Sequence, residues 1–487
     1  MTFNRLAIAL LFIAIASAAC LMPAQNDTFW HLRAGFEAWH GGTPLYRDIF
    51  SHTAYGHYWP NHEWLTQVVF YATYAIGGLP ALTLLCATIV TSAWAMSFRM
   101  MRGTTTVRVC LIAAVIPASA ALWSLRPQAL SLGFVSLCAW LITCSPPQLS
   151  RRGFRLRVKL RRTTVALAEV GSPARFAPAA ILVVPLLCAV WANFHGAALF
   201  AVVLLAGALA GAVIYDRTRV PELSIVLALS VAAMCLTPLG VRWWPEMIGS
   251  LARIRSLSIS EWQPPSLFEP VDAAFWFVAV ALVGLGWRRR HDLNGQDAIL
   301  VGMAVALLPL AVSAGRNVSP FLLVALPALT RVLPAPVLTW QAGLARRPAR
   351  LAHTWVACSV AAVAVLVVGF SWNARASRLG WQPLPESVVA AVDACPGNLY
   401  NRYDDGGFFI WFTPAQRVFL DGRQDPYPVQ LIQDHRTTEA VGAYRDIFRR
   451  FGIRCAALPS SSVTAVSLLH AGWHPTARDG GWIVLTE

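Results

Sequence analysis

Long apolar runs recur along the chain, and they limit its fold more than any other feature of the sequence. A helix of about 20 apolar residues crosses the roughly 30 Å of hydrocarbon in a bilayer, and its backbone satisfies its own hydrogen bonds there. Such runs lie at residues 5–22, 80–98, 105–123, 127–144, 177–194, 196–215, 220–238, 272–287, 297–313, 317–333 and 352–371. Because 56% of the 487 residues are hydrophobic and only 13% are charged, little polar surface is left for a soluble globule. We therefore predict a polytopic α-helical membrane protein with about eleven spans.

Arginine-rich segments between the runs predict how the chain is oriented in the membrane. They lie at Arg99 and Arg102, residues 151–162, Arg217 and Arg219, residues 288–290 and residues 346–350. Short cytoplasmic loops are enriched in Lys and Arg, and the predicted spans place all of these segments on the side of the N-terminus. We therefore predict a protein of the inner-membrane type with a cytoplasmic N-terminus. The net charge of +15 then reflects topology and contact with membrane lipids, so no nucleic-acid partner is expected.

Two segments leave an alternative interpretation open. The first run is interpreted as a retained signal-anchor helix, because Ser17 stands where a lipoprotein cleavage site requires Leu. Residues 64–78 are apolar enough to enter the membrane, but a full span there would reverse the side of every following basic loop. We interpret them as an interfacial or re-entrant helix that ends at a Gly-Gly-Leu-Pro break at residues 77–80, and two full helices are the alternative.

The chain is predicted to divide into two domains. Residues 1–372 form the transmembrane domain, and residues 373–487 form a small soluble α/β domain on the extracytoplasmic side. Within the first domain, residues 24–79 form the first outer loop. A second long loop at residues 239–271 is interpreted either as a lid above a membrane cavity or as a simple interfacial loop.

The C-terminal domain carries four features that guide its interpretation. Residues 408–412 and 417–420 are predicted to be short strands, and the spacing of apolar residues over 444–451 predicts a helix. Asp421 and Arg423 follow the second strand, where they form either a buried structural pair or a substrate contact. Two of the ten cysteines, Cys395 and Cys455, lie in this domain, where an oxidising compartment would permit a disulfide.

Polar residues crowd the first outer loop. Asp27 lies just beyond the first span, where low-dielectric surroundings raise the pKa of a carboxylate and let it act as a base; a helix N-cap is the alternative. Imidazole and carboxylate groups also suit a divalent cation, although no spacing here is diagnostic and interfacial hydrogen bonding is the alternative. The candidate ligands are His31, Asp48, His52, His57, His62 and Glu63.

Ionisable residues at three later helix ends indicate an anionic ligand at the outer leaflet. Arg126, His195 and Arg316 each lie beside a predicted span, and charged groups at membrane depth tend to face a cavity. Snorkelling to the lipid headgroups would explain one such arginine, but it does not require other polar residues beside it. The polar and aromatic residues on the same predicted face are Asn193, Glu261 and Trp262.

Together these motifs resemble the GT-C class of membrane glycosyltransferases, the group that contains protein mannosyltransferases and aminoarabinose transferases. Each motif alone is weak, but together they extend over nearly the whole chain. The segments that carry the resemblance are Asp27–Leu32, Asp48–Ser51, Glu63–Leu65, Arg126–Gln128, Trp191–Gly196, Glu261–Trp262, Gly315–Asn317, Tyr403–Phe408 and Val418–Arg423.

The resemblance implies a sugar transfer from a polyprenyl-phosphate donor to an envelope acceptor at the outer face of the inner membrane. Such families use an acid from the first outer loop, and Asp27 matches that position as the base. The usual second acid is replaced by Thr28, so Asp48 and Glu63 are the candidates for that role. The groups expected to stabilise the departing phosphate are Arg126, His195 and Arg316. The residues expected to line the substrate site or its lid are His31, Asn193, Glu261 and Trp262.

Two other functions fit the same residues. One is a transporter or flippase of an anionic lipid or sugar, and the other is a non-catalytic GT-C-like scaffold in envelope assembly. The sequence shows no inverted repeat, and its polar residues gather on one predicted face instead of near the midplane, which disfavours transport. It also lacks a P-loop and a dinucleotide-binding turn, which agrees with a lipid-linked donor.

Overall fold

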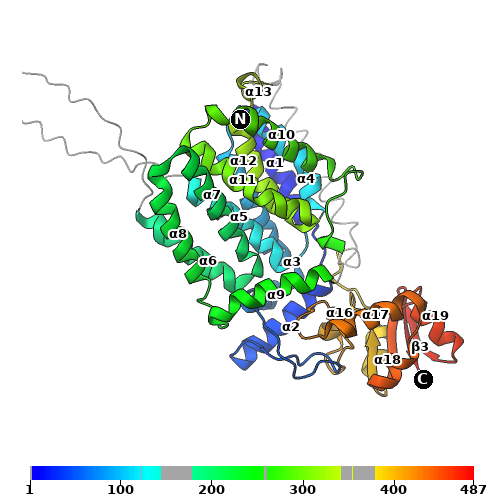
Figure 1. Ribbon diagram of the computed structural model, residues 1–487. Coiled ribbons are helices and arrows are strands. Elements are labelled where there is room, and N and C mark those ends of the chain that lie inside the picture. The colour runs from blue at the N-terminus through cyan, green and yellow to red at the C-terminus, as the bar shows by residue number, and fades with distance from the viewer. Residues whose placement is uncertain (1–2, 122, 144–177, 257–259, 342–353, 355–378) are drawn as a thin grey trace, which may run out of the picture.

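The computed structural model describes residues 3–121, 123–143, 178–256, 260–341, 354 and 379–487. A bundle of helices forms the larger part, and a smaller C-terminal domain is attached at one end of it (Figure 1). The helices of the bundle are α1 Phe3–Cys20, α2 Asn26–Gly41, α3 Trp64–Met100, α4 Thr105–Ala120, α5 Pro127–Thr143, α6 Pro178–Phe194, α7 Leu199–Tyr215, α8 Val220–Ala233, α9 Trp243–Ser256, α10 Ala273–Arg288, α11 Gly295–Ser313, α12 Val318–Val332 and α13 Ala335–Leu338. The start of α1 lies at the end opposite the C-terminal domain (Figure 1).

The described helices include four that are long and apolar enough to cross a membrane. These segments are Phe3–Cys20, Trp64–Met100, Gly196–Tyr215 and Gly295–Ser313, and the shorter apolar helices are Thr105–Ala120, Pro127–Thr143, Ile181–Phe194 and Ala273–Arg288. The predicted runs at 220–238 and 317–333 form the shorter helices α8 and α12. The predicted run at 352–371 lies outside the described residues, apart from residue 354, as does the predicted domain boundary at 372. The architecture is therefore mostly helical, as predicted, and the number of eleven spans stays a prediction.

The predicted break after residue 76 is present inside α3. Gly77 and Gly78 leave the helical conformation, and Gly78 has a φ of 64°, a left-handed value that glycine adopts without steric cost. The two halves of α3 therefore meet at a kink, with Pro80 starting the second half. Whether the first half spans the membrane stays a prediction.

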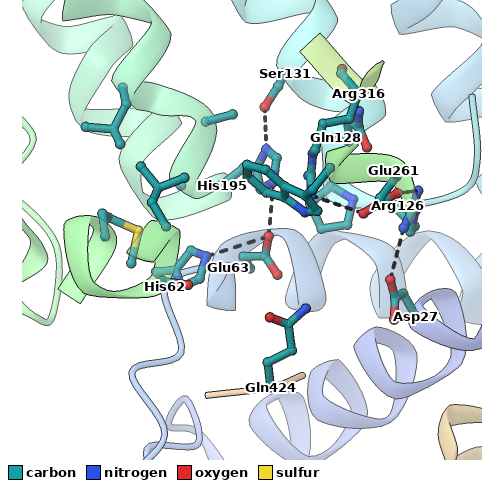
Figure 2. A pocket seen from close by; sticks show the side chains of 18 of the residues that line it. Asp27, His62, Glu63, Arg126, Gln128, Ser131, His195, Glu261, Arg316 and Gln424 are labelled. Carbon is teal, nitrogen blue, oxygen red and sulfur yellow. Dashed lines mark hydrogen bonds and ion pairs between the residues drawn. The ribbon is translucent and has the colours of Figure 1, made fainter. Parts of the chain in front are cut away.

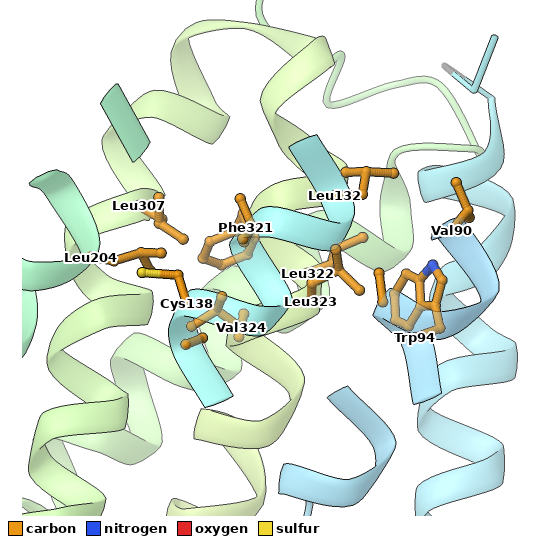
Figure 3. Close-up of a cluster of buried hydrophobic side chains, with 14 of the residues drawn as sticks. Val90, Trp94, Leu132, Cys138, Leu204, Leu307, Phe321, Leu322, Leu323 and Val324 are labelled. Atoms are coloured by element: carbon orange, nitrogen blue, oxygen red, sulfur yellow. The ribbon is translucent and has the colours of Figure 1, made fainter. Parts of the chain in front are cut away.

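Helix α12 lies at the centre of the bundle. All of its residues except Arg331 are buried. Figure 3 shows its segment 321–324 packed between side chains of α3, α5, α7 and α11. A helix that other helices cover on every side needs no polar face, which explains its continuous apolar sequence.

Small residues let α7 and α11 approach each other closely. Gly207 and Gly211 lie on one face of α7, and Gly302 faces them from α11. A Cβ added at Gly207 would come within 2.7 Å of the Ala306 Cβ and would press on the backbone of Gly302. Such spacing of small residues allows dispersion contacts between helix backbones in a membrane.

The C-terminal domain is built on a four-stranded sheet with the order β1-β2-β4-β3. Strands β1 and β2 are parallel, whereas β4 is antiparallel to both of its neighbours. The elements are α15 Glu386–Asp393, β1 Asn398–Asn401, α16 Gly406–Phe412, α17 Val429–Val441, α18 Arg445–Phe451, β2 Ile453–Pro459, α19 Val463–His470, β3 His474–Asp479 and β4 Trp482–Thr486. A disulfide between Cys395 and Cys455 links the segment after α15 to β2. The predicted helix over 444–451 is confirmed as α18.

Neither predicted strand in the tail is part of this sheet. Residues 408–412 belong to helix α16, so that prediction is wrong. Phe408 and Phe412 are four residues apart, and both rings pack against Phe29 of α2, at centroid distances of 5.6 and 5.2 Å. A short apolar run has no periodicity that separates strand from helix, and this packing across domains selects the helix.

The second predicted strand pairs with the first outer loop. Val418 forms an isolated parallel bridge with Ser51. Its N–H donates to the Phe50 carbonyl at 3.0 Å, and its carbonyl accepts from the His52 N–H at 3.0 Å. The first outer loop therefore joins the C-terminal domain to the bundle.

Candidate active site

A cavity of about 490 Å³ lies where the bundle meets the C-terminal domain. One wall is apolar and comes from α7, α9 and α11, while polar side chains from loops and helix ends form the rest. The main polar and aromatic lining residues are Asp27, Trp30, His31, Trp59, Asn61, His62, Glu63, Arg126, Gln128, Ser131, His195, Glu261, Trp262, Arg316, Asn317, Arg423, Gln424 and Asp425. Most of the residues singled out from the sequence therefore meet in one place.

Four charged residues form an ion-pair chain along one side of the cavity. Arg126 donates from Nη1 to Asp27 Oδ2 at 3.1 Å and from Nη2 to Glu261 Oε2 at 2.7 Å. Arg316 donates from Nη1 to the other Glu261 oxygen at 3.1 Å. A single carboxylate thus bridges two guanidinium groups (Figure 2). The two arginines and the two carboxylates balance each other in charge. An anion that displaced Glu261 would contact both arginines.

Short-range contacts fix the two arginines. Arg126 lies just before α5, and its Nε donates to Ser124 Oγ at 2.7 Å. Arg316 lies in the 3-10 turn Gly315–Asn317, where its carbonyl accepts from Gln128 Nε2 at 3.1 Å. Its guanidinium carbon lies 4.5 Å from the ring centroid of Trp262. Both cations are therefore held in place before any ligand binds, which is the arrangement that electrostatic stabilisation of a leaving group needs.

Asp27 lies in the first turn of α2, not at its N-cap, which is Gln25. Burial raises the pKa of Asp27, although Arg126 opposes the shift. Its Oδ1 also accepts from the Trp30 indole N–H at 3.0 Å. Gly422 faces this carboxylate, and any side chain at Gly422 would clash with it. The backbone of the C-terminal domain at Gly422 therefore packs directly against the Asp27 carboxylate.

Glu63 is surrounded by three histidines on the other side of the cavity. Its carboxylate oxygens lie 3.3 Å from His195 Nε2, 3.5 Å from His31 Nε2 and 3.8 Å from His62 Nε2 (Figure 2). The three histidines come from three elements: His31 from α2, His62 from the segment before α3, and His195 from the junction of α6 with Gly196–Ala198. We call these four residues the Glu63 cluster. No arginine forms an ion pair with Glu63 in the described structure.

Burial favours the neutral forms of three members of this cluster: Glu63, His31 and His195. It raises the pKa of Glu63 to about 7, and it lowers the pKa values of His31 and His195 well below their ordinary value. Behind His195, its Nδ1 lies 2.8 Å from Ser131 Oγ, which accepts from the Trp191 indole N–H at 2.9 Å. Because the Ser131 hydroxyl can donate or accept at Nδ1, either nitrogen of His195 can carry the proton. Glu63 and His195 can therefore exchange a proton at Nε2.

A third carboxylate that lines the cavity, Glu261, differs from Asp27 and Glu63, whose pKa values are raised. Burial alone would raise the pKa of Glu261, but Arg316 and Arg126 outweigh it, and the pKa is lowered. Glu261 therefore stays charged, whereas Glu63 is close to half protonated at neutral pH. Carboxyl groups in one site whose environments separate their pKa values are typical of acid–base chemistry.

The loop Gly422–Asp425 of the C-terminal domain also lines the cavity. A buried network supports it from behind: Arg423 Nη2 lies 2.7 Å from Asp421 Oδ2 and 2.6 Å from Asp48 Oδ1. The Tyr427 hydroxyl donates to Asp421 Oδ2 at 2.6 Å. Asp48 belongs to the first outer loop, so the network crosses between the two domains.

Three predicted site residues lie outside the cavity lining. Asp48 and Asp421 are fully buried behind the wall, where they hold Arg423. Asn193 instead forms hydrogen bonds within the bundle. Its Oδ1 accepts from the Trp64 indole N–H at 2.8 Å, and its Nδ2 donates to the carbonyls of Ala189 and Leu236. The predicted residues that do line the cavity are Asp27, His31, Glu63, Arg126, His195, Glu261, Trp262, Arg316 and Arg423.

The six candidate metal ligands do not form one group. His52 Nε2 lies 2.9 Å from the Leu399 carbonyl and His57 Nδ1 lies 3.2 Å from the Pro426 carbonyl, so both contact the C-terminal domain. Among the residues that the structure describes, no three His, Cys, Asp or Glu side chains have an arrangement suited to a metal ion.

Several polar lining residues were not singled out from the sequence, among them Ser131, Gln424 and Asp425. Ser131 lies within an apolar helix, and Gln424 and Asp425 lie directly after the Asp-Gly-Arg turn. A single serine in an apolar run carries no functional signal. Gln424 and Asp425 could have been predicted as lining residues, because residues that directly follow a recognised motif lie close to it in space.

Solved structures with the same arrangement of elements are membrane oligosaccharide and sugar transferases. The Archaeoglobus fulgidus oligosaccharyltransferase tethered to an acceptor peptide matches with a TM-score of 0.53 and 13% identity, over 93% of this chain and 68% of that one. ArnT from Cupriavidus metallidurans, bound to undecaprenyl phosphate, matches with a TM-score of 0.51 and 14% identity, over 99% and 97%. The chain has the GT-C fold.

A third GT-C structure is AglB from Archaeoglobus fulgidus in complex with an inhibitory peptide and a dolichol-phosphate. It matches with a TM-score of 0.51 and 11% identity, over 93% of this chain and 69% of that one. No protein-family model and no curated protein sequence matches the chain. The likeness is thus one of GT-C fold, and it agrees with the resemblance inferred from the motifs.

Proposed function

We propose that this GT-C protein transfers a sugar from a polyprenyl-phosphate donor to an acceptor at the extracytoplasmic face of a bacterial inner membrane. The observation that carries the proposal is the cavity: two fixed arginines, a charged carboxylate between them and a second carboxylate with a pKa near 7 meet beside an apolar wall. The arginines suit a phosphate, the polar side chains suit a sugar, and the apolar wall suits a lipid tail. The solved GT-C neighbours hold dolichol-phosphate and undecaprenyl phosphate.

In this proposal the donor phosphate binds between Arg126 and Arg316. The guanidinium forks that hold Glu261 suit two phosphate oxygens equally well. As the bond from the anomeric carbon to the phosphate breaks, charge grows on that phosphate, and the fixed cations stabilise it. The lipid tail would lie along the apolar wall, whose side chains include Leu199, Phe200 and Val203 of α7, Leu251 of α9 and Leu310 of α11.

In this proposal Glu63 is the general base that takes the proton from the attacking acceptor hydroxyl. Direct displacement places the base on the side of the sugar away from the leaving phosphate. Asp27 is bonded to Arg126 and therefore lies beside the phosphate, whereas Glu63 lies toward His195 and Gln424 (Figure 2). A base with a pKa near 7 is also matched to its task at neutral pH.

The roles of Asp27 and His195 then differ from those implied by the resemblance. Asp27 holds Arg126 and is available to bind a substrate hydroxyl. His195 is uncharged because its pKa is lowered by burial, so it contributes no positive charge to the phosphate site. It instead orients Glu63 and shares its proton.

The direct test combines donor binding with turnover. Purified protein in detergent would be incubated with radiolabelled polyprenyl-phosphate sugars, and release of polyprenyl phosphate would be measured for wild type, Glu63→Gln and Asp27→Asn. Glu37→Gln is the matched control, since Glu37 pairs with Arg33 on α2 outside the cavity lining. We expect donor binding to survive in Glu63→Gln while release disappears. Binding of no donor by wild type would leave the transporter and scaffold functions, and a loss of release in EDTA would support the predicted divalent cation.

A further inference from the structure

Gln424 has a backbone conformation that its residue type rarely adopts. Its φ is 62°, and among the described residues it is the one non-glycine residue with a positive φ. This left-handed conformation places Cβ close to the backbone, so glutamine is less stable here than glycine would be. Strained backbone of this kind is kept where the surrounding structure enforces it, and it clusters at ligand sites.

The loop around Gln424 is fixed on every side. The Asp425 N–H donates to the Arg423 carbonyl at 2.7 Å, and the Tyr427 N–H donates to the Gln424 carbonyl at 3.1 Å. From the bundle, Arg253 of α9 donates to the carbonyls of Asp425 and Tyr427 at 3.3 and 3.0 Å. The conformation of Gln424 is therefore imposed by both domains and does not arise from a free loop.

This conformation directs the Gln424 side chain into the cavity, toward Glu63 (Figure 2). The Tyr403 side chain interacts with the amide, while Gln424 Oε1 is buried and has no hydrogen-bond partner in the described structure. A buried polar atom without a partner costs free energy until a ligand pairs with it. The amide is neutral, so it suits a hydroxyl group better than a phosphate.

We propose that Gln424 binds a sugar or acceptor hydroxyl next to Glu63, so that the C-terminal domain contributes a substrate-binding residue to the GT-C cavity. The inference rests on the proposed transferase function. A hydroxyl donates and accepts, and the free Oε1 beside the general base would accept from it and hold it in place. Glycine would relieve the backbone but could not make this contact, which explains why a strained glutamine stands here.

Three substitutions separate binding from strain. Gln424→Ala and Gln424→Gly both remove the amide, and Gln424→Gly also removes the strain; Gln424→Asn keeps an amide on a residue that tolerates the left-handed conformation. We expect kcat/KM to fall roughly three- to tenfold in both Ala and Gly variants, as for one lost hydrogen bond, with partial recovery in Asn. The thermal midpoint of Gln424→Gly should be at or above that of wild type, because the substitution removes the backbone strain. Gln430→Ala, at an exposed glutamine of α17, should leave the rate unchanged.

The assay also identifies which substrate carries the hydroxyl. A weaker donor Kd in Gln424→Ala would place the contact on the donor sugar, and a raised acceptor KM with an unchanged donor Kd would place it on the acceptor. If both Gln424→Ala and Gln424→Gly turn over at the wild-type rate, this inference is overturned, whereas the proposed transferase function is not affected. Failure of wild type to bind any polyprenyl-phosphate sugar would overturn both.

Discussion

Three of the carboxylates that line the cavity have different neighbours, and these neighbours give them different properties. Glu261 stays charged because two arginines hold it, and Asp27 is tied to one of those arginines and to an indole N–H. Burial raises the pKa of Glu63 to about 7 and lowers the pKa values of its neighbours His31 and His195, so Glu63 can gain and lose a proton near neutral pH. The chemistry assigned to each acid follows from its neighbours and not from its residue type, which is the same or nearly so in all three.

The pH dependence of turnover should report the protonation of Glu63. A base acts in its unprotonated form, so the wild-type rate should rise as pH increases through about 7 and then level off. Below that pH it should fall about tenfold per unit, since the unprotonated fraction does so. In Glu63→Gln the rate should drop about 100-fold or more at every pH, without this inflection. Initial rates from pH 5 to 9 measure both, and an unchanged inflection in the variant would exclude Glu63 as the base.

Glu261 should compete with the donor phosphate for Arg126 and Arg316. Glu261→Gln removes the charge and keeps the size, so it leaves both guanidinium groups free to bind an anion. We expect the Kd for polyprenyl phosphate to decrease several-fold, with a stronger dependence on salt concentration. Isothermal titration in detergent measures it. A weaker affinity would show that Glu261 positions the arginines for the phosphate and does not compete with it.

At the scale of elements, backbone packing between helices sets the shape of the cavity. The apolar wall is carried by α7 and α11, and the glycine contacts of Gly207 and Gly211 fix the separation of these two helices. The kink at residues 77–78 sets the direction of the first half of α3, whose N-terminus carries Glu63. Glycine thus acts far from the chemistry, because it decides where the helix ends lie.

Replacing Gly207 by alanine should separate α7 from α11. The new Cβ would lie 2.7 Å from the Ala306 Cβ, so the helices must move apart, at a cost of about 1–3 kcal/mol for overpacking. Gly284→Ala in α10 is the control, since its Cβ would meet no atom within 4 Å and alanine favours a helix. Thermal unfolding in detergent compares the two variants. Equal midpoints would mean that the close contact contributes nothing to stability.

At the scale of the whole molecule, the C-terminal domain contributes residues to the lining of the cavity. The first outer loop joins it through the Ser51–Val418 bridge and the buried Asp48–Arg423 pair. Helix α9 contacts it from the other side through Arg253. Arginine segments distant in sequence gather at the opposite end: Arg102 bonds to Asp297, and Arg289 bonds to the Leu333 carbonyl. These arginine contacts therefore lie at a different end of the bundle from the cavity.

The Cys395–Cys455 disulfide gives a test of both fold and compartment. Reduction should destabilise the C-terminal domain by about 2–4 kcal/mol, because the bond closes a long loop. In protein isolated from cells, Cys395 and Cys455 should resist alkylation until a reductant is added. Mass spectrometry of the alkylated peptides measures this. Full labelling of Cys395 without reductant would contradict an oxidising, extracytoplasmic location for this domain.

Several features could be predicted from the sequence because they depend on local chemistry. The apolar runs predicted a helical membrane-type bundle, the Gly-Gly-Leu-Pro segment predicted the kink in α3, and apolar spacing predicted α18. Asp27, Arg126, Glu261 and Arg316 were predicted as site residues because charge beside an apolar run has few structural explanations, and all four line the cavity. Such signals need no knowledge of distant contacts.

The tertiary structure decided the rest, because each remaining feature depends on segments far apart in the chain. Phe408 and Phe412 became a helix through contact with Phe29, and Asp48 became a structural residue through Arg423. The pKa of Glu63 near 7 arises from burial, and its histidine partners come from separate elements. Sequence alone determined which residue types were present for phosphate and proton chemistry. Only packing decided which of them meet in one cavity, since pKa and partnership are properties of the space around a side chain.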